Sequence, residues 1–331
     1  MKTSVQTVLG EKPIRELGFT LMHEHILSAG PGLAWAYPQL INDGYPERTG
    51  IGYANRILAT LKEAKAAGVD SILEMTPYDL GRNALLMKEL SEKSGINIIA
   101  CTGWYKEQKL VVGCLKNYAA ERFAEVFVHD LTVGMEGTDI KAEFLKTACE
   151  KDGMTPEREV IHRACAMAAK ETGSFIVLHQ DAGAKTAYEQ LRVLKEEGVD
   201  MRRVKVDHVL DTTDRDYVRW IGEQGVWMGA DRLPTWRLPG ILPNDVRYEN
   251  IKALIEMGFA DQLLFGHDSA CLSMGADAIP PNEEGLNGAA NPYGLTWLKR
   301  ITMPKLIEMG VDEAVVDRIA YENPTRFFTG E

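Results

Sequence analysis

Short apolar runs alternate with longer amphipathic segments along most of the chain. Helical periodicity marks segments such as 53–68, 156–173 and 187–198, and each closes on a glycine, the residue that commonly ends a helix. Eight apolar runs between such segments have the length and composition of strands: Phe19–Ile26, Ser71–Met75, Ile96–Thr102, Glu143–Cys149, Phe175–His179, Val204–Val209, Val226–Ala230 and Leu263–His267. Strands alternating with helices predict a parallel sheet, and eight strands close a (β/α)8 TIM barrel.

An open, doubly wound α/β sheet is the alternative, but no G-x-G-x-x-G motif follows any of these runs. No linker interrupts the alternation, so we expect residues 1–331 to form one domain. Two stretches, 28–50 and 271–293, are rich in glycine, proline or aromatic residues and predict long loops after the first and eighth strands. Loops that follow barrel strands lie on the catalytic face, which favours lids over disordered segments. The aromatic residues of 28–50 either line an entrance for an apolar group or pin the loop in place.

Composition narrows the range of partners. Hydrophobic residues make up 45% of the chain and charged residues 26%, as in ordinary globular proteins. The net charge of -11 argues against nucleic acid and anionic membrane surfaces, both of which attract basic patches. The N-terminal segment has no apolar core of a signal peptide, and the five cysteines include no C-x-x-C pair. We therefore expect a cytoplasmic protein with reduced cysteines and a small-molecule substrate.

Two histidines stand close together near the end of the first predicted strand. Side chains alternate between the faces of a strand, so His23 and His25 point the same way and Glu24 points the opposite way. Paired imidazoles on an inward face are typical of a metal site, although a packed or surface pair explains the same pattern.

Further metal-binding side chains occupy equivalent places on other strands. His179, His208 and Asp268 end the fifth, sixth and eighth predicted strands, whose carboxyl ends converge on one mouth of a barrel. Imidazole and carboxylate together suit zinc, manganese, cobalt or iron. Each residue alone could instead be a buried polar group satisfied by local hydrogen bonds.

The remaining histidines are interpreted as structural. His267 precedes Asp268 and should point away from the mouth, whereas His129 and His162 fall in helical segments and favour surface positions or helix packing.

Lys146 is unusual because it lies in an otherwise apolar strand, Glu143–Cys149. A buried ammonium beside two metal cations is strongly disfavoured. A negative charge is needed between the metal ions, but this strand offers no Asp or Glu that faces them. Glu143 lies three residues before Lys146 and should face the other way. A strand-end lysine that reaches solvent is the alternative.

Taken together, these residues are specific enough to compare with a known group. The chain resembles the phosphotriesterase family of the amidohydrolase superfamily, including its phosphotriesterase-like lactonases. The resemblance rests on the sequences LG-x-T-x-x-HEHI at Leu17–Ile26, CTGWY at Cys101–Tyr105, FLK at Phe144–Lys146, LHQ, DHV, GADR at Gly229–Arg232, GHD at Gly266–Asp268 and ENPTRFF at Glu322–Phe328.

The resemblance implies two divalent metal ions, zinc first and manganese, cobalt or iron as alternatives. His23, His25 and Asp268 would hold the more buried ion, and His179 and His208 the more exposed one. Lys146 would be carboxylated by carbon dioxide, and its carbamate would bridge both ions. That anion removes the difficulty of a buried ammonium.

The same resemblance implies a hydrolase in which a metal-bridging hydroxide attacks the substrate and Asp268 takes up its proton. Tyr105 and Arg232 resemble the lactonase branch at positions where paraoxon-hydrolysing members tend to carry tryptophan and histidine. We expect them to contact substrate oxygens, and lactones or other carboxylic esters to be the substrates. A phosphotriester hydrolase and a non-catalytic metal-binding barrel are the alternatives. The family also implies a homodimer.

Overall fold

The computed structural model describes residues 2–29, 53–105, 119–234, 242–274 and 291–331. Its main sheet contains nine parallel strands in the order β10-β9-β8-β7-β6-β5-β4-β3-β11. These strands are β3 (Thr20–Ala29), β4 (Ser71–Glu74), β5 (Asn97–Trp104), β6 (Phe144–Cys149), β7 (Phe175–Gln180), β8 (Val204–Val206), β9 (Trp227–Ala230), β10 (Leu263–Phe265) and β11 (Ser269–Met274).

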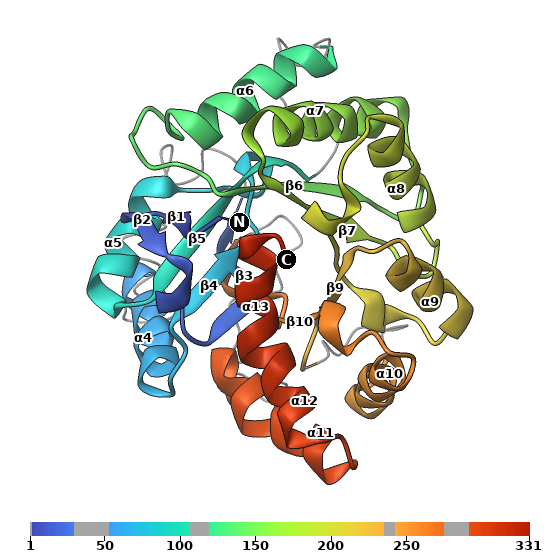
Figure 1. Ribbon diagram of the computed structural model, residues 1–331. Coiled ribbons are helices and arrows are strands. Elements are labelled where there is room, and N and C mark those ends of the chain that lie inside the picture. The colour runs from blue at the N-terminus through green and yellow to red at the C-terminus, as the bar shows by residue number, and fades with distance from the viewer. Residues whose placement is uncertain (1, 30–52, 106–118, 235–241, 275–290) are drawn as a thin grey trace.

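The sheet closes on itself because its two end strands are consecutive pieces of one stretch of chain. β10 pairs with β9, and β11, which begins four residues after β10 ends, pairs with β3. Between them, the Asp268 amide donates to the His23 carbonyl over 2.9 Å. Eight strand positions therefore form a barrel, which confirms the predicted (β/α)8 architecture and all eight predicted strands (Figure 1).

Helices surround the barrel, as Figure 1 shows. They are α4 (Tyr53–Ala66), α5 (Ala84–Ser94), α6 (Ala120–Thr132), α7 (Pro156–Thr172), α8 (Ala187–Glu196), α9 (Arg215–Glu223), α10 (Asn244–Glu256), α11 (Met303–Glu308), α12 (Glu313–Asp317) and α13 (Asn323–Thr329). In α7 the Thr155 side chain accepts from the Arg158 amide, Pro156 begins the first turn and Gly173 ends the helix in the left-handed conformation. The three predicted helices thus begin and end close to their expected residues.

An antiparallel pair of strands, β1 (Ser4–Thr7) and β2 (Gly10–Pro13), precedes the barrel and was not predicted. Glu143, at the amino end of β6, accepts from the Gln6 amide over 2.8 Å and pairs with Lys2. Its side chain therefore contacts the N-terminal segment, whereas Lys146 on the same strand contacts Asp207 inside the barrel.

Apolar residues of the strands divide into two layers with the period of two that a strand imposes. Ile98 belongs to the cluster between sheet and helices, whereas its neighbour Ile99 belongs to the cluster inside the barrel. Ile176 and Val177 divide in the same way. This alternation assigns an inward or outward direction to each polar side chain on the same strands.

A register shift in β3 changes that alternation where it matters most. Leu21 packs outward and Met22 inward, so strict alternation would turn His23 outward. The pairing with β4 shifts between Leu21 and Glu24, and His23 faces the barrel interior together with Met22. A bulge of this kind re-aims the side chains that follow it.

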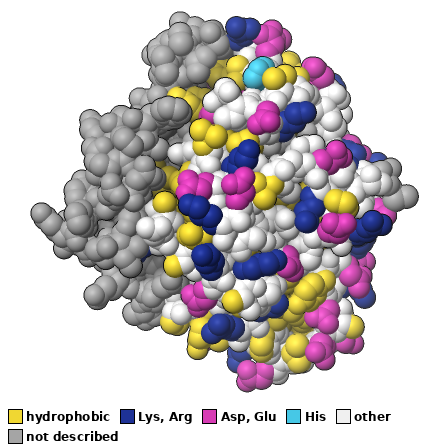
Figure 2. Space-filling model, turned by 90° about the vertical axis from the view of Figure 1, so that its left-hand side faces the viewer, with side chains coloured by type: hydrophobic (Ala, Val, Ile, Leu, Met, Phe, Trp, Pro, Cys, Tyr) yellow, Lys and Arg dark blue, Asp and Glu magenta, His cyan; other side chains and the backbone are white. Residues whose placement is uncertain are grey.

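Four further observations bear on the predictions. Cys101, Cys149, Cys165 and Cys271 are free thiols, and Cys114 lies outside the described residues. Within the described part of the chain, no helix has both the length and the apolar character needed to cross a bilayer. Basic and acidic side chains are interspersed over the face drawn in Figure 2. Most of the two predicted long loops lies outside the described residues.

Candidate metal centre

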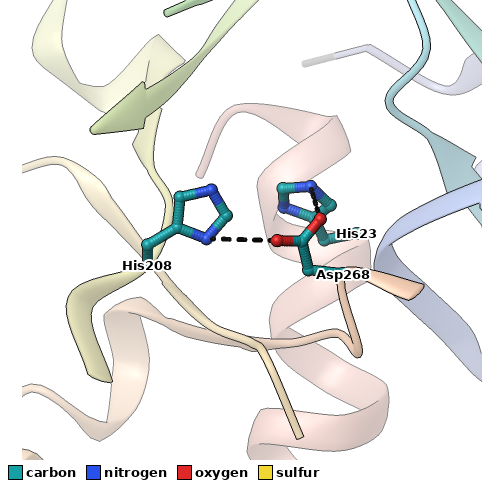
Figure 3. Close-up of side chains that lie close together, drawn as sticks. All are labelled: His23, His208 and Asp268. Atoms are coloured by element: carbon teal, nitrogen blue, oxygen red, sulfur yellow. Dashed lines mark ion pairs between the residues drawn. The ribbon is translucent and has the colours of Figure 1, made fainter. Parts of the chain in front are cut away.

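Three side chains from distant parts of the sequence meet at the carboxyl ends of the strands (Figure 3). His23 lies on β3, His208 follows β8, and Asp268 lies between β10 and β11. His23 Nε2 is 3.1 Å from Asp268 Oδ1, and His208 Nδ1 is 3.8 Å from Asp268 Oδ2. One ligand atom from each residue lies within 4.8 Å of the other two, a spacing that could hold a metal ion.

His25 approaches the same carboxylate from the other side. Its Nε2 lies 3.4 Å from Asp268 Oδ1, while its Nδ1 is 2.8 Å from the Thr76 hydroxyl. Thr76 in turn donates to the buried carboxylate of Glu74, which also accepts from the Thr76 amide over 3.0 Å. This chain of contacts fixes the ring of His25 with Nε2 directed at Asp268.

His179 and His208 form a second pair. His179 Nδ1 and His208 Nε2 are 2.7 Å apart, so these two nitrogens face each other in the metal-free site. The other ring nitrogen of His208 lies 2.8 Å from Asp231 Oδ1, and the His208 amide donates to Asp231 Oδ2 over 3.2 Å. Asp231 therefore holds both the backbone and the ring of His208.

Lys146 lies on β6, and only 1% of its surface is exposed. The solvent-reaching alternative is therefore wrong. Gly103 makes this position possible, because a Cβ there would overlap the Lys146 main chain where β5 and β6 pair. The ammonium donates to Asp207 Oδ2 over 3.0 Å, so the uncarboxylated lysine has an anionic partner inside the barrel.

Three residues of the site have a left-handed backbone. The φ angles are 63° at His208, 59° at Arg232 and 52° at Asp268, a region that residues other than glycine seldom adopt. His208 follows Asp207 and Arg232 follows Asp231, and the left-handed turn lets consecutive side chains both face the site. Such strain concentrates at functional sites, where the surrounding structure maintains it.

Electrostatic interactions in the site oppose the effect of burial. Burial raises the pKa of Asp268, but His23 and Arg232 hold this pKa well below its usual range, so the carboxylate stays ionised. Burial lowers the pKa of His23, yet Asp207 and Asp268 raise it to about 10 in the metal-free protein. Burial and the neighbouring His208 hold the pKa of His179 well below 6.5, which leaves a neutral imidazole.

These atoms fit a pair of divalent metal ions. Bonds of about 2.0–2.1 Å in a tetrahedral shell place neighbouring donor atoms about 3.3 Å apart. The separations of 3.1 and 3.4 Å from Asp268 Oδ1 to His23 Nε2 and His25 Nε2 match that spacing. His179 and His208 offer two more nitrogens, and Lys146 reaches the same cluster from within β6, with Nζ 3.0 Å from Asp207 Oδ2. The predicted ligand residues therefore all lie at one mouth of the barrel.

The two predicted substrate-contacting residues also lie at this mouth. The Tyr105 hydroxyl is 3.1 Å from His179 Nε2 and donates to Glu150 Oε1 over 3.1 Å. Burial and Glu150 raise the pKa of Tyr105 well above 10, which keeps the phenol protonated. Arg232 donates from Nε to Asp268 Oδ2 over 2.8 Å and pairs with Asp211.

The other histidines occupy the structural positions expected of them. His267 turns away from the mouth, with Nδ1 2.6 Å from Glu24 Oε1 and Nε2 accepting from the Leu298 amide over 3.2 Å. His162 packs within α7, and His129 is exposed on α6.

Sequence reasoning missed Asp207, Asp231, Thr76 and Glu150, all of which contact the site. A signal for the first two was present, since each directly precedes a residue already selected. By the same strand alternation, the side chains of Lys205 and Asp207 both point into the barrel interior.

Comparison with known proteins agrees with this arrangement. The sequence profile of the phosphotriesterase family matches residues 3–328. The chain belongs to the phosphotriesterase family.

Proteins similar to this chain have names that state different activities. An aryldialkylphosphatase of Saccharolobus solfataricus is 34% identical, with 95% of this chain and 96% of the relative aligned. A phosphotriesterase homology protein of Mycobacterium tuberculosis is 31% identical over 98% of this chain and 97% of its own. An N-acetyltaurine hydrolase of Xenopus tropicalis is 25% identical, with 98% of this chain and 97% of the relative aligned. These names span phosphoester and amide bonds, so membership alone does not select the substrate.

Proposed function

We propose that the protein is a binuclear-metal hydrolase of carboxylic esters, with lactones as its substrate class. The observation that carries this proposal is the convergence of His23, His25, His179, His208, Asp268 and the buried Lys146 at the carboxyl ends of the barrel strands. When bound, two divalent ions would supply an activated water at neutral pH and a Lewis acid for the scissile carbonyl. A carbamate would form on Lys146 if its neutral amine attacked carbon dioxide and released a proton.

The chain's own residues would orient the substrate and move the proton. Asp268 is ionised and partly accessible, with 15% of its side chain exposed, so it can accept a proton from the attacking water and pass it to solvent. Arg232 steadies Asp268 through Nε and pairs with Asp211 through Nη1, so it would direct Nη2 at a substrate oxygen. The protonated Tyr105 hydroxyl, beside His179, would donate to the ester or lactone oxygen after releasing Glu150.

A phosphotriester hydrolase is the second candidate, because a 34% identical relative is named aryldialkylphosphatase. Tyr105 and Arg232 support the lactone class over this candidate, since both resemble the lactonase branch. An amide hydrolase is a third outcome that the assay should include, given the relative named N-acetyltaurine hydrolase.

The deciding experiment is a substrate panel with zinc- or manganese-loaded protein. Lactones of increasing acyl length, paraoxon and N-acetyltaurine are assayed side by side, and Asp268→Asn serves as the blank. Turnover of lactones that is absent in the blank supports the proposal. Turnover of paraoxon or N-acetyltaurine alone would replace the lactone class, and a protein that binds no divalent metal would refute the metal centre.

Variants of the mouth residues separate substrate recognition from metal binding. Tyr105→Phe and Arg232→Met should change the ratio of lactone to paraoxon turnover while each protein retains its metal content, measured by elemental analysis. Loss of metal in either variant would show that the residue supports the metal site and does not select the substrate.

A further inference from the structure

A buried ion pair lies directly beneath the candidate metal centre. Lys205 and Asp207 are both fully buried, and they stand two residues apart on and just after β8, so both side chains enter the barrel interior. Their side chains pair with each other, and Lys205 Nζ also donates to the Met22 carbonyl over 2.9 Å. Neither residue contributes to the ligand set proposed above.

Asp207 links this pair to two of the proposed metal-binding residues. While Oδ1 faces Lys205, Oδ2 lies 2.9 Å from His23 Nδ1 and 3.0 Å from Lys146 Nζ. His23 Nδ1 is also 3.4 Å from Asp231 Oδ2, and it makes no hydrogen bond of good angle to either carboxylate. The nitrogen therefore sits in a fork between two carboxylates while Nε2 faces Asp268.

We propose that the Lys205–Asp207 pair positions His23 for the more buried metal ion. In the metal-bound protein Asp207 would accept a hydrogen bond from His23 Nδ1–H, which would leave Nε2 as the metal-binding nitrogen and fix the plane of the ring. This inference rests on the proposed metal centre and adds a positioning role for two residues outside the ligand set.

The physical reasoning follows from how imidazole binds metals. A metal-binding histidine usually donates its other ring N–H to a carboxylate or carbonyl, which fixes the tautomer and strengthens the ligand. Asp231 already holds His208 by its ring and its backbone amide, so Asp207, at 2.9 Å, is the carboxylate left for His23. Each of these two histidines thus has its own aspartate, and the two aspartates follow the neighbouring strands β8 and β9.

Lys205 makes the buried carboxylate tolerable and ties it to the strand that carries His23. An unpaired buried carboxylate is strongly destabilising and in practice would become protonated. Lys205 supplies the opposite charge, and its bond to the Met22 carbonyl anchors the pair to the residue next to His23. A change at Lys205 should therefore reach His23 through both Asp207 and the β3 backbone.

A third metal ion between His23 Nδ1, Asp207 and Asp231 is the competing explanation, because these atoms also lie within 4.8 Å of one another. The buried ammonium of Lys205 pairs with Asp207. A dication at that position would meet this ammonium at close range, so the contacts favour a positioning carboxylate over a ligand.

The test measures the affinity of the protein for each of the two proposed metal ions. Wild type, Asp207→Asn and the double variant Lys205→Met/Asp207→Asn are titrated with cobalt(II) and zinc(II) against a chromophoric chelator. Asparagine retains the shape at position 207, and the double variant removes the unpaired ammonium in case the single variant does not fold. Asp231→Asn is the matched control, because it removes the corresponding carboxylate from His208.

We expect wild type to bind two equivalents, and both Asp207 variants to bind one of them about 10- to 100-fold more weakly while the other is unchanged. In the zinc protein the ring N–H resonance of His23 should move or vanish in these variants while that of His208 persists. Asp231→Asn should instead weaken binding of the other metal equivalent, and it should shift or remove the ring N–H resonance of His208 while that of His23 persists. Circular dichroism of the metal-free variants confirms that they are folded.

Three outcomes would overturn the inference. Unchanged affinity for both equivalents in the folded double variant would show that the pair is only structural. A third equivalent in wild type that is lost with Asp207 would make Asp207 a ligand. Failure of wild type to bind any metal would remove the proposed centre itself, whereas the first two outcomes leave that centre intact.

Discussion

Protonation of His162 should destabilise the protein at mildly acidic pH. This histidine is fully buried on α7, where Nδ1 lies 2.7 Å from the Arg158 carbonyl and Nε2 lies 3.1 Å from Gln190 Nε2. The same Gln190 nitrogen donates to the His179 carbonyl over 3.0 Å, which holds the amide as a donor. A proton on Nε2 would therefore face another N–H group, and burial lowers the pKa of His162 from 6.5 to about 4.

The sign and the magnitude follow from linkage. Between pH 6.5 and about 4 the unfolded chain binds a proton at residue 162 that the folded protein does not, so the free energy of unfolding falls as pH falls through this window. The full effect corresponds to about 3 kcal/mol, of which about 2 kcal/mol is lost by pH 5. Above pH 6.5 the contribution is complete.

Guanidinium unfolding of the metal-free protein at pH 7 and pH 5 measures this effect. His162→Gln removes the titrating group, so wild type should lose about 2 kcal/mol more than the variant between the two pH values. His129→Gln, which removes an exposed helical histidine, is the matched control and should follow wild type. Equal losses in wild type and His162→Gln would refute the reasoning, whatever the variant's stability at pH 7.

Three further predictions concern the metal centre. A Cβ at Gly229 would lie 2.8 Å from Asp231 Oδ2 and nearer still to Asp207. Gly229→Ala should therefore lower the free energy of unfolding by about 1–3 kcal/mol in a thermal unfolding experiment. Gly183→Ala is the control and should lower it little. Thr76→Val should weaken metal binding about 10-fold in a chelator titration without unfolding the protein, because it removes the hydroxyl that orients the His25 ring. Unchanged affinity would show that Thr76 does not position His25. Chelation of the metals should lower the melting temperature, and their readdition should restore it.

The barrel could be predicted because its strands and helices differ in period along the sequence. The eight apolar runs match the observed strands, and three helices end within two residues of the glycines that closed their patterns. The small strand pair β1–β2 was missed, since Ser4–Thr7 and Gly10–Pro13 are short and partly exposed. Nothing in their local pattern distinguishes them from an irregular N-terminal segment.

The candidate site was predicted in part, and the reason for the limit is geometric. Alternation correctly placed His23 and His25 on one face, but only the register shift in β3 decides which face that is. The roles of Asp207 and Lys205 depend on contacts across the barrel with Lys146 and the Met22 carbonyl, respectively, which lie far away in sequence. A local pattern cannot show such contacts.

The left-handed backbone at His208, Arg232 and Asp268 limits how the protein can be engineered for heat resistance. Each such residue costs of order 1–3 kcal/mol, and glycine would relieve the strain without a Cβ. A selection for thermostability alone would therefore favour glycine at these three positions. Every one of those substitutions would remove a side chain from the mouth of the barrel. A stabilised variant that keeps its chemistry must gain its stability in the helices and surface turns, away from the strand ends.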